Sequence, residues 1–482
     1  MKTSPIKLFN SSSRSIETFT PINDTAVGLY CCGPTVYNYQ HIGNLRTYIF
    51  EDLLVRTLRY AGYSVNHVMN ITDVGHLVSD ADEGEDKMLL ASKREKKTSY
   101  EIAEYYTEIF FEHCGWLNIE KPNIVCKATE HIKQMISLIE KLEEKDIAYH
   151  SGGNVYFDVA KFSRYGEFAK LDLESLKAGA RIEVDSKKRN PQDFALWFTK
   201  SKFENQELQW ESPWGRGYPG WHIECSAMAR EYLGDSFDIH CGGIDHIPVH
   251  HTNEIAQSEA ATGKKMAQIW MHGGFLVVDK EKMSKSTGGF LTLDKLKERG
   301  IDPLAYRMLC LGGSYRKELS WSWEALEGAA QRLDNLKSKF LSHDFSAWKD
   351  LDSDLLNQQL EKLDPSDGFK QIENEFKEAI FNDLGMSQGL AILQKALDDK
   401  SLEEIEVLAL ALKFDTVFAI DIQSWLQTIE IPSNILALAQ KRDEARKQKD
   451  WDLSDSLRDQ LQELGWTVKD STDGFRLAKN GR

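Results

Sequence analysis

The sequence predicts an α/β protein: a parallel-sheet domain split by an insertion, then an α-helical bundle, then a small C-terminal domain. Two observations carry this expectation. A strand–helix–strand pattern, typical of parallel sheets with right-handed crossovers, occurs near the amino terminus and again after residue 235. Beyond about residue 319 the spacing of apolar residues turns helical. Because the chain has 482 residues, it is too long for one core and should form three or more domains.

The first copy of the pattern lies near the amino terminus. "AVGLYCCG" (residues 26–33) predicts a short buried strand, and "SVNHVMNITD" (64–73) predicts the next strand. Between them, "HIGNLRTYIFEDLLVRTLRYAGY" (41–63) carries apolar residues at helical spacing. We therefore assign residues 1–117 to the first half of the split domain.

The second copy of the pattern follows a long insertion. "SFDIH" and "QIWMHGGFLVV" predict strands, and "VHHTNEIAQSEAA" predicts the helix between them, after a glycine turn in "CGGID". Residues 210–275 form this second half, and residues 276–318 follow it as a lysine-rich loop region. The insertion, residues 118–209, is predicted to be a separate subdomain, because "GGNVYFDVAKF" and "NPQDFALWF" predict extended segments between charge-rich stretches.

Two helical regions complete the chain. Residues 319–431 predict a bundle, interrupted by the polar "KLDPSDG". Residues 432–482 follow a break at "IPSN" and begin with a basic helix, "LALAQKRDEARKQKDW". This segment has ten Lys/Arg and nine Asp/Glu, about +1, so that it differs electrostatically from the rest of the chain.

Composition excludes several classes of protein. The net charge of -16 argues against a general nucleic-acid binder, and against a DNA-binding protein, because phosphate contacts require clustered lysine and arginine. Seven cysteines, an odd number scattered through a long chain, argue for reduced thiols rather than a disulfide framework. The amino terminus has no apolar signal region, and no run of eighteen apolar residues predicts a membrane span, so we expect a cytoplasmic protein.

Two motifs predict a nucleotide site. His41-Ile42-Gly43-Asn44 falls between a strand and a helix, where free backbone N–H groups would meet a phosphate, Gly43 would permit close approach and His41 would donate to a phosphoryl oxygen. A loop with flexible flanks carries "KMSKS" and would grip a triphosphate through Lys282, Ser284, Lys285 and Ser286. An ordinary helix start is an equally open interpretation of the first motif, and a solvated basic loop is the alternative for the second.

At these motifs the sequence resembles class I aminoacyl-tRNA synthetases, whose signatures are a HIGH-type and a KMSKS-type motif on the two halves of a Rossmann-like domain. Within that class it resembles the cysteinyl-tRNA synthetase family over nearly the whole chain. The strings that carry this resemblance include "CGPTVYNYQHIGN", "AGARIEVDSKKRNPQDFALW", "SPWGRGYPGWHIECSAMA", "FDIHCGGIDHIPVHHTNEIAQS" and "WMHGGFLVVDKEKMSKS". Asn44 departs from the second histidine of the HIGH-type motif, because an amide donates a hydrogen bond but carries no positive charge.

The resemblance implies one catalytic zinc ion held by Cys32, Cys225, His250 and Glu254. His250 and Glu254 are four residues apart on a predicted helix and so share a face, whereas Cys32 and Cys225 would come from loops at the ends of other elements. Without the resemblance, a surface pair is the ordinary interpretation of His-x3-Glu. A zinc–thiolate bond would select L-cysteine over serine and alanine, which would make an editing domain unnecessary.

The adjacent thiols "CC" raise a choice between two candidate ligands. Successive side chains of a strand point to opposite faces, so Cys31 and Cys32 cannot both reach one metal. Cys32 occupies the family's position just before the turn at Gly33 and Pro34. We expect Cys31 to pack behind the sheet as a small apolar side chain.

The resemblance also implies the reaction and its partners. ATP, with Mg²⁺, would activate L-cysteine to cysteinyl-adenylate, and the cysteinyl group would pass to the 3′ end of tRNA(Cys), on a monomeric enzyme. Residues 276–318 would hold the KMSKS loop and a stem-contact region, and residues 432–482 the anticodon-binding domain. The implied catalytic residues are His41, Asn44, Lys282 and Lys285.

Further residues would bind the amino acid and the anticodon. The amino-acid pocket would include Thr35, Thr72, Trp221 and Asp245, for which a core tryptophan and strand-end polar groups are the alternative interpretations. The anticodon contacts would be Arg446, Trp451, Asp455, Arg458 and Asp470, since an aromatic among cations can stack on an unpaired base. A buried Trp451 on a solvated charged helix is the open alternative.

Two other functions fit part of the sequence. A cysteine ligase acting on a small-molecule amine would resemble the catalytic half but would lack the C-terminal domain. A catalytically silent tRNA-binding paralogue would not need the intact "KMSKS" or the four candidate zinc ligands. The C-terminal segment, the "KMSKS" motif and the four candidate zinc ligands are all present in this sequence. We therefore favour the tRNA ligase.

Overall fold

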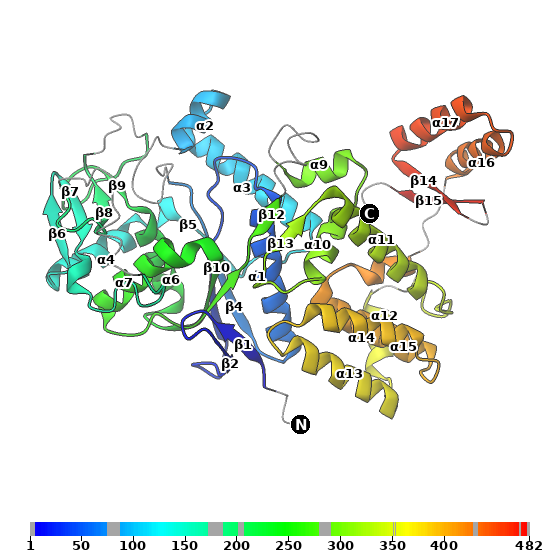
Figure 1. Cartoon of the computed structure of the whole chain (residues 1–482), viewed down its shortest axis with the longest axis horizontal. Helices are drawn as coiled ribbons and strands as arrows, with labels where there is room; N and C mark the ends of the chain where they lie inside the picture. The colour runs from blue at the N-terminus through cyan, green and yellow to red at the C-terminus, as the bar shows by residue number, and fades with distance from the viewer. Residues whose placement is uncertain are drawn as a thin grey trace.

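A five-stranded parallel sheet forms the centre of the structure (Figure 1). The computed structural model describes residues 5–74, 87–171, 187–200, 207–278, 291–349, 351, 353–427, 432–471 and 474–479. The strands lie in the order β11-β10-β3-β4-β5, and all neighbours are parallel. They are β3 (Val27–Cys31), β4 (Val65–Ile71), β5 (Ile124–Lys127), β10 (Phe237–Gly243) and β11 (Ala267–Gly273). The prediction of a parallel sheet built from two halves is confirmed.

The two halves meet between β3 and β10, where the strand order reverses. From β3 the chain crosses to β4 and β5 on one side, and from β10 it crosses to β11 on the other. In open α/β sheets, ligands bind at the carboxyl ends of the strands beside such a switch point. Cys32 follows β3 directly at this position.

The two faces of the sheet pack against different helices. Along β3, Leu29 and Cys31 belong to one buried cluster, while Tyr30 and Cys32 belong to a second one, as the period of two in a strand requires. The first cluster contains α1 (Ile42–Tyr60), and the second contains α4 (Ile132–Glu144), α6 (Trp221–Leu233) and α7 (Thr252–Thr262). Cys31 and Cys32 therefore face opposite layers, as predicted.

The segments before and between the halves add smaller elements. An antiparallel hairpin of β1 (Lys7–Asn10) and β2 (Ser15–Thr18) packs beside β11, and α2 (Lys87–Glu95) and α3 (Ser99–Trp116) follow β4. The insertion contains its own four-stranded sheet of β6 (Ala148–Ser151), β7 (Asn154–Phe157), β8 (Phe194–Phe198) and β9 (Tyr218–Pro219). Short 3₁₀ turns lie at Ala128–Glu130 and Val159–Lys161.

The predicted boundary of the insertion at residue 118 is wrong in one respect. Strand β5 (Ile124–Lys127) lies inside the range 118–209, yet it pairs with β4 as the edge of the central sheet. Its four residues gave no distinctive signal, because a short strand at an edge has few buried apolar positions. Strand β9, at 218–219, extends the inserted sheet past residue 209.

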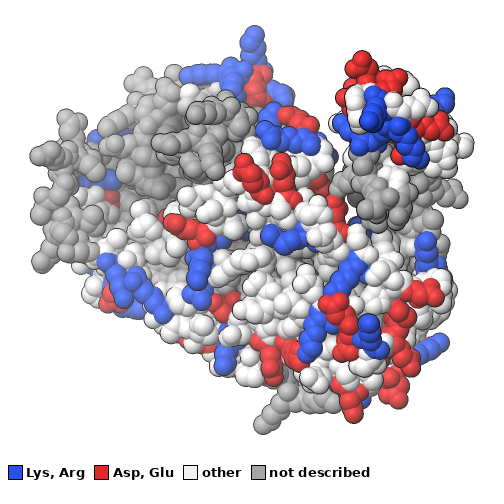
Figure 2. Space-filling view, turned by 45° about the vertical axis from the view of Figure 1, so that its right-hand side comes forward, with Lys and Arg blue, Asp and Glu red and all other residues white. Residues whose placement is uncertain are grey.

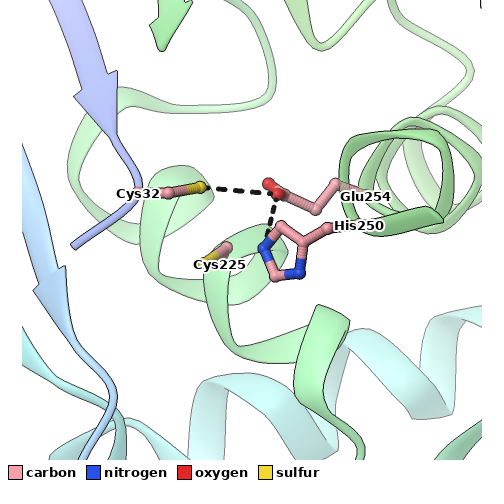
Figure 3. A group of neighbouring side chains, drawn as sticks. All are labelled: Cys32, Cys225, His250 and Glu254. Carbon is pink, nitrogen blue, oxygen red and sulfur yellow. Dashed lines mark hydrogen bonds and ion pairs between the residues drawn. The ribbon is translucent and has the colours of Figure 1, made fainter. Parts of the chain in front are cut away.

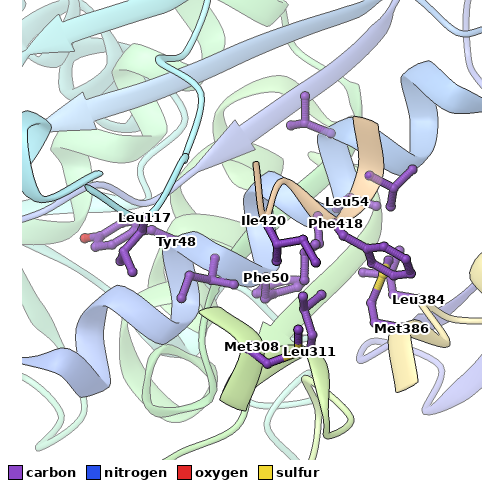
Figure 4. Packing of buried hydrophobic residues seen from close by; sticks show 14 of the residues in the cluster. Tyr48, Phe50, Leu54, Leu117, Met308, Leu311, Leu384, Met386, Phe418 and Ile420 are labelled. Carbon is purple, nitrogen blue, oxygen red and sulfur yellow. The ribbon is translucent and has the colours of Figure 1, made fainter. Parts of the chain in front are cut away.

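A helical region packs against α1 through a continuous apolar core (Figure 4). Its elements are β12 (Leu276–Val278), α9 (Leu293–Glu298), α10 (Pro303–Leu311), β13 (Leu319–Trp321), α11 (Trp323–Phe340), α12 (Ser353–Glu361), α13 (Asp367–Ile380), α14 (Met386–Asp398), α15 (Glu404–Phe418) and the 3₁₀ turn Ile422–Leu426. Phe50 and Leu54 of α1 lie among residues of α10 and of the segments around α14 and α15 in Figure 4. The predicted bundle is confirmed, and it shares one core with the sheet.

Two buried arginines tie these layers together. Arg46 of α1 donates to the backbone carbonyls of five residues, Gly274, Phe275, Ser314, Tyr315 and Lys317. Arg307 of α10, fully buried, donates to Phe418 O at 2.6 Å, Leu117 O at 2.9 Å and the Asp52 carboxylate at 2.5 Å. Since a guanidinium has five donors, each arginine can satisfy carbonyls from segments far apart in sequence.

The C-terminal residues form a unit set apart at the upper right of Figure 1. Helices α16 (Ser433–Lys447) and α17 (Trp451–Glu463) pack on a hairpin of β14 (Trp466–Ser471) and β15 (Gly474–Lys479). Ile435, Ala439, Leu461, Trp466 and Val468 form its small separate core. In the part of the chain that the structure describes, no helix combines the length and apolar character needed to cross a membrane.

Candidate metal centre and active site

Four buried side chains converge at the switch point of the sheet (Figure 3). Cys32 follows β3, Cys225 lies on α6, His250 lies in a π-helical turn (Ile247–His251), and Glu254 lies in the first turn of α7. Their ligand atoms all lie within 4.8 Å of one another. Cys225 comes from within a helix, so the expectation that both thiols lie on loops is wrong for this residue.

The Glu254 carboxylate connects two other members of the group, His250 and Cys32 (Figure 3). Its Oε1 atom lies 3.0 Å from His250 Nε2 and 3.8 Å from Cys32 Sγ. The π-helical turn before α7 keeps His250 and Glu254 on the same side, although they do not belong to one regular helix. Two thiols, an imidazole and a carboxylate at these separations are a donor set that suits a tetrahedral Zn²⁺ ion.

Two glycines allow the chain to pass close to this group. A Cβ atom on Gly33 would lie 1.6 Å from Asn70 O, so only glycine lets the turn after Cys32 approach the end of β4. A Cβ atom on Gly242 would lie 2.7 Å from His246 Nδ1 and 2.8 Å from the His251 ring. The sequence "CGG" at the end of β10 therefore makes room for histidines.

A shell of histidines surrounds the four side chains, and the sequence analysis missed it. His240 Nε2 lies 2.9 Å from Glu254 Oε2, and His251 Nε2 lies 3.4 Å from Cys32 Sγ. His251 Nδ1 is 2.8 Å from His272 Nε2, and His222 Nδ1 is 3.0 Å from His250 Nδ1. Six of the 13 histidines fall between residues 222 and 272, and this clustering was the available signal.

These histidines offer an alternative set of ligands. Cys32, His240, His251 and Glu254 also place their ligand atoms within 4.8 Å of one another. The two sets share Cys32 and Glu254, so they describe overlapping positions for one ion. Only the first set contains a second thiol.

Electrostatics separates the charge states within the group. A hydrogen bond with Cys32 lowers the pKa of Cys225 to about 7 against the opposing effect of burial. Burial would raise the pKa of Glu254, but His240 and His250 hold it well below its usual range. Burial also raises the pKa of the Cys32 thiol well above its usual value. A carboxylate and one thiolate are thus available near neutral pH in a fully buried position.

One of the four predicted pocket residues, Trp221, contacts a member of the candidate metal centre. The Trp221 ring, at the start of α6, lies 4.9 Å from the His250 ring. Thr35 and Thr72 pair through a backbone bridge, and Thr72 Oγ1 lies 3.5 Å from the Glu224 carboxylate. Asp245 lies just past the end of β10 in the 3₁₀ turn Ile244–His246, with an exposed side chain. The fully buried Glu224 of α6 is a further polar group that sequence reasoning missed.

The first turn of α1 differs from the prediction. Ile42 N donates to Leu291 O, Gly43 N donates to His41 Nδ1, and Asn44 N donates to His41 O. These amides are therefore not free for a phosphate, because His41 caps the helix with its own ring. Asn44 has an exposed side chain, and burial lowers the pKa of His41, which favours the neutral ring.

The remaining predicted residues divide between described and undescribed segments. Lys282, Ser284, Lys285 and Ser286 lie outside the described residues, and nothing is described of the Asp470 side chain in β14. Trp451 begins α17 and is 55% exposed, so the alternative of a buried tryptophan is wrong. The Arg446 guanidinium lies 5.6 Å from the Trp451 ring, and Arg458 Nη1 lies 3.5 Å from Asp455 Oδ1.

Comparison with known proteins defines the class. Residues 18–331 match the family model of the tRNA synthetases class I (C) catalytic domain. A solved structure of Mycobacterium tuberculosis methionyl-tRNA synthetase in complex with methionyl-adenylate shares the fold, with a TM-score of 0.54, 16% identity, and 83% of this chain and 91% of that chain covered. The parallel sheet with its switch-point site is thus the catalytic fold of class I tRNA synthetases.

The family within this class follows from closer relatives. Residues 428–475 match the family model of the cysteinyl-tRNA ligase anticodon binding domain. The chain is 49% identical to the cysteine–tRNA ligase of Treponema denticola, over 96% of this chain and 98% of the relative. It is 44% identical to cysteine–tRNA ligase 1 of Burkholderia lata, over 98% of this chain and 97% of the relative. The chain belongs to the cysteine–tRNA ligase family, whose members are ligases that form an aminoacyl-tRNA.

Proposed function

We propose that this chain joins L-cysteine to tRNA(Cys) in two steps, with cysteine recognised at the buried metal centre. In the first step a carboxylate oxygen of cysteine attacks the α-phosphorus of ATP, bound with Mg²⁺, and pyrophosphate leaves. In the second step a hydroxyl of the terminal ribose of the tRNA attacks the adenylate carbonyl, and AMP leaves. The observation that carries the proposal is the convergence of Cys32, Cys225, His250 and Glu254 within 4.8 Å beside Trp221.

The donor set explains how one amino acid would be selected. Zn²⁺ held by these four residues would have to accept a fifth ligand, and that added position would prefer a substrate thiolate to the hydroxyl of serine. The second donor set substitutes His240 and His251 for Cys225 and His250, and we assign these two histidines to a supporting role. His240 Nε2 donates to Glu254 Oε2, 2.9 Å away, and thereby fixes the orientation of a ligating carboxylate. Trp221, Thr35, Thr72 and Asp245 would bound the rest of the amino-acid pocket.

The nucleotide would be held by side chains rather than by helix amides. Since His41 Nδ1 accepts from Gly43 N at 3.0 Å, a neutral ring carries its proton on Nε2 and can donate to a phosphoryl oxygen. Asn44 would add a neutral donor, and Gly43 would allow close approach. Lys282, Ser284, Lys285 and Ser286 would stabilise the departing pyrophosphate, since lysine is a mobile point charge.

The domain assignment follows the same proposal. The catalytic domain would consist of residues 1–117 and 210–275 together with β5. The KMSKS loop and the region that contacts the tRNA stem would lie in residues 276–318, and the bundle would lie in residues 319–431. Residues 432–482 would bind the anticodon, with Trp451 exposed beside Arg446, Asp455, Arg458 and Asp470. An exposed aromatic with a cation over its face is suited to stacking on an unpaired base.

The experiment that tests this function is cysteine-dependent exchange between ATP and pyrophosphate, measured with and without a tRNA(Cys) transcript, together with charging of that transcript. We expect exchange without tRNA, charging with it, and neither activity with serine at equal concentration. Exchange without charging would instead support a ligase for small molecules. The absence of exchange in a folded, metal-loaded protein would support a silent tRNA-binding paralogue and would refute the proposal.

A further inference from the structure

A group of exposed cations stands where α2 meets α3. This group, which we term the basic elbow, consists of Lys93, Arg94, Lys96 and Lys97. Glu95 is the one acidic residue within the range 93–97, so these five residues carry a formal charge of four minus one, or +3, in a chain of net charge -16. Tyr100, in the first turn of α3, exposes 56% of its surface beside the group. Concentrated positive charge on an acidic protein indicates a local anionic partner.

The elbow has a defined shape without any ligand. Lys96 adopts a left-handed backbone conformation with φ of 56°, which turns the chain sharply between the helices. Thr98 then caps α3: its hydroxyl accepts from Glu101 N at 3.2 Å, and the Glu101 carboxylate accepts from Thr98 N at 2.8 Å. Glu95 accepts from Tyr106 Oη at 2.5 Å. Both sides of the turn are therefore anchored to α3.

The elbow lies against the loop that joins the metal centre to the nucleotide motif. Residues 33–40 connect Cys32 to His41, and Arg94 Nη2 donates to Tyr37 O in this loop at 3.4 Å. Tyr39, in the same loop, lies 3.4 Å from Tyr105 through their hydroxyls, and its ring packs edge-on against Tyr106 of α3 with centroids 5.4 Å apart. The cations thus stand at the rim of the proposed active site.

Helix α2, which leads into the elbow, and the C-terminal unit both lie in the upper part of Figure 1, α2 left of centre and the unit at the right. In Figure 1, α2, α9 and the helices α16 and α17 all lie toward the top of the view. Figure 2 shows lysine and arginine side chains gathered at the top of the main body and on the neighbouring C-terminal unit, with acidic side chains among them. A polyanion that reaches from the active site to the C-terminal unit would leave from this side.

We propose that the basic elbow binds the phosphate backbone of the acceptor arm of the tRNA, with Tyr100 packing on a ribose or an unpaired base. The inference rests on the proposed function, because it assumes that the 3′ end of the tRNA enters the site. Lys93, Lys96 and Lys97 are the phosphate contacts, and Arg94, bound to Tyr37 O, joins the elbow to the loop that enters the active site. Contacts of this kind fix the position of the RNA and carry no sequence information.

Charge favours RNA over the small substrates as the ligand of the elbow. ATP and cysteine would react inside the site, whereas Lys93, Lys96 and Lys97 are exposed. A duplex arm presents many phosphates, and exposed lysines contact phosphates as point charges. The sequence before α2 is acidic at Asp80, Asp82, Glu83, Glu85 and Asp86, outside the described residues, so an internal role for the lysines in neutralising this segment is a distinct outcome of the test.

The test compares two triple variants of the full-length protein. K93A/K96A/K97A removes three positive charges from the elbow. K362A/K370A/K400A removes three exposed lysines from the region of α12 to α14, on the lower side of Figure 1. For each we would measure the Kd for a tRNA(Cys) transcript between about 50 and 300 mM KCl, the KM for tRNA in charging, and exchange between ATP and pyrophosphate in the absence of tRNA.

We expect the elbow variant to raise the Kd and the KM for tRNA about tenfold at moderate salt, and to reduce the slope of log Kd against log salt by about 2, since each phosphate contact contributes about 0.7 to 0.9. Exchange should stay normal, and the control variant should match wild type. An unchanged affinity for tRNA, with an unchanged slope of log Kd against log salt, would overturn the proposal. A loss of exchange as large as the loss of tRNA binding would also overturn it, because the lysines would then act on the active-site loop or on the acidic segment. If the wild-type protein itself shows no exchange or charging, the proposed function fails. The comparison of Kd values for the tRNA transcript still decides whether the elbow binds RNA.

Discussion

Two buried glutamates on opposite sides of the sheet, Glu254 and Glu51, have pKa values that are shifted in opposite directions. Glu254 is fully buried beside Cys32, and Glu51 is 1% exposed beneath Cys31. His240 and His250 hold the pKa of Glu254 well below its usual range, against the effect of burial. Burial raises the pKa of Glu51 well above its usual range, against a smaller opposing contribution from the Cys31 thiol.

The difference shows that partners, rather than depth, decide the charge of a buried acid. On the Cys32 face, the histidines keep a carboxylate ionised, as a cation site requires. On the Cys31 face, α1 and the bundle surround the acid with apolar side chains, and the neutral form prevails. We infer that the first face is organised for chemistry and the second for stability. Substitutions on the two faces should therefore have different consequences.

The largest effect is expected from Cys225→Ala on the chemical face. Loss of one thiolate should remove the bound metal and with it the preference for cysteine over serine, a discrimination of about four powers of ten. The ratio of kcat/KM values for the two amino acids in the exchange assay measures it. Cys126→Ala is the matched control, because Cys126 is a buried thiol in the same apolar cluster but outside the ligand group. Retained discrimination in the Cys225 variant would contradict the assigned role.

The next largest effect is expected from Arg307→Ala on the stability face. The variant removes one of the two arginine partners of the buried Asp52 carboxylate, which keeps Arg56 at 2.8 Å, and it removes the guanidinium donor from the carbonyls of Leu117 and Phe418. The free energy of unfolding should fall by about 2–4 kcal/mol, because two buried carbonyls lose a charged donor and Asp52 loses one of its two cations. Denaturant unfolding measures this change, with Arg332→Ala at an exposed position of α11 as the control. At denaturant concentrations below the midpoint of its unfolding, the variant should keep the metal and the exchange activity. Loss of metal from the folded variant would contradict the assignment of chemistry to one face of the sheet and stability to the other.

A smaller effect is expected from His240→Asn, which sharpens the choice between the two donor sets. If His240 only orients Glu254, metal affinity should fall by about ten- to a hundredfold, with one site per chain still filled at saturation. Competition with a chelating dye measures the affinity. A variant that binds no metal, alongside a Cys225→Ala variant that does, would assign the ligands to Cys32, His240, His251 and Glu254 instead.

The smallest effect concerns pH and Glu51. A carboxyl group whose folded-state pKa is raised stabilises the protein most below its unfolded pKa, near 4.5, and that stability is lost as the pH rises toward the folded value. Glu51→Gln removes the titration, so the wild type should lose up to about 1.4 kcal/mol of stability per pH unit relative to the variant above pH 5. Urea unfolding at several pH values gives this difference. A relative stability that is independent of pH would show that Glu51 does not titrate abnormally.

Much of this arrangement could be predicted from the sequence, because the residues that define it repeat a local pattern. The period of two along "LYCC" placed Cys31 and Cys32 on opposite faces, and apolar spacing located α1 and the bundle. Strand β5 escaped notice because four residues at a sheet edge leave little periodicity. The capping of α1 by His41 also escaped it, since a ring that accepts from Gly43 N depends on a side-chain torsion.

The histidine shell could not be inferred from spacing. His240, His251 and His272 come from β10, the π-helical turn and β11, and only the parallel pairing of the two strands brings them together. A tertiary arrangement of this kind has no local periodicity. The resemblance to a known family supplied the four candidate ligands, and the structure shows that their side chains converge.

Metal analysis of purified Cys31→Ala and Cys32→Ala variants tests the central claim most directly. Both residues are buried neighbours at the end of one strand, so general effects of removing a thiol are matched. We predict one zinc per chain and a nearly normal KM for cysteine in the Cys31 variant, with metal and discrimination against serine lost together in the Cys32 variant. Zinc kept in the Cys32 variant, whether or not the Cys31 variant also keeps it, would contradict the account.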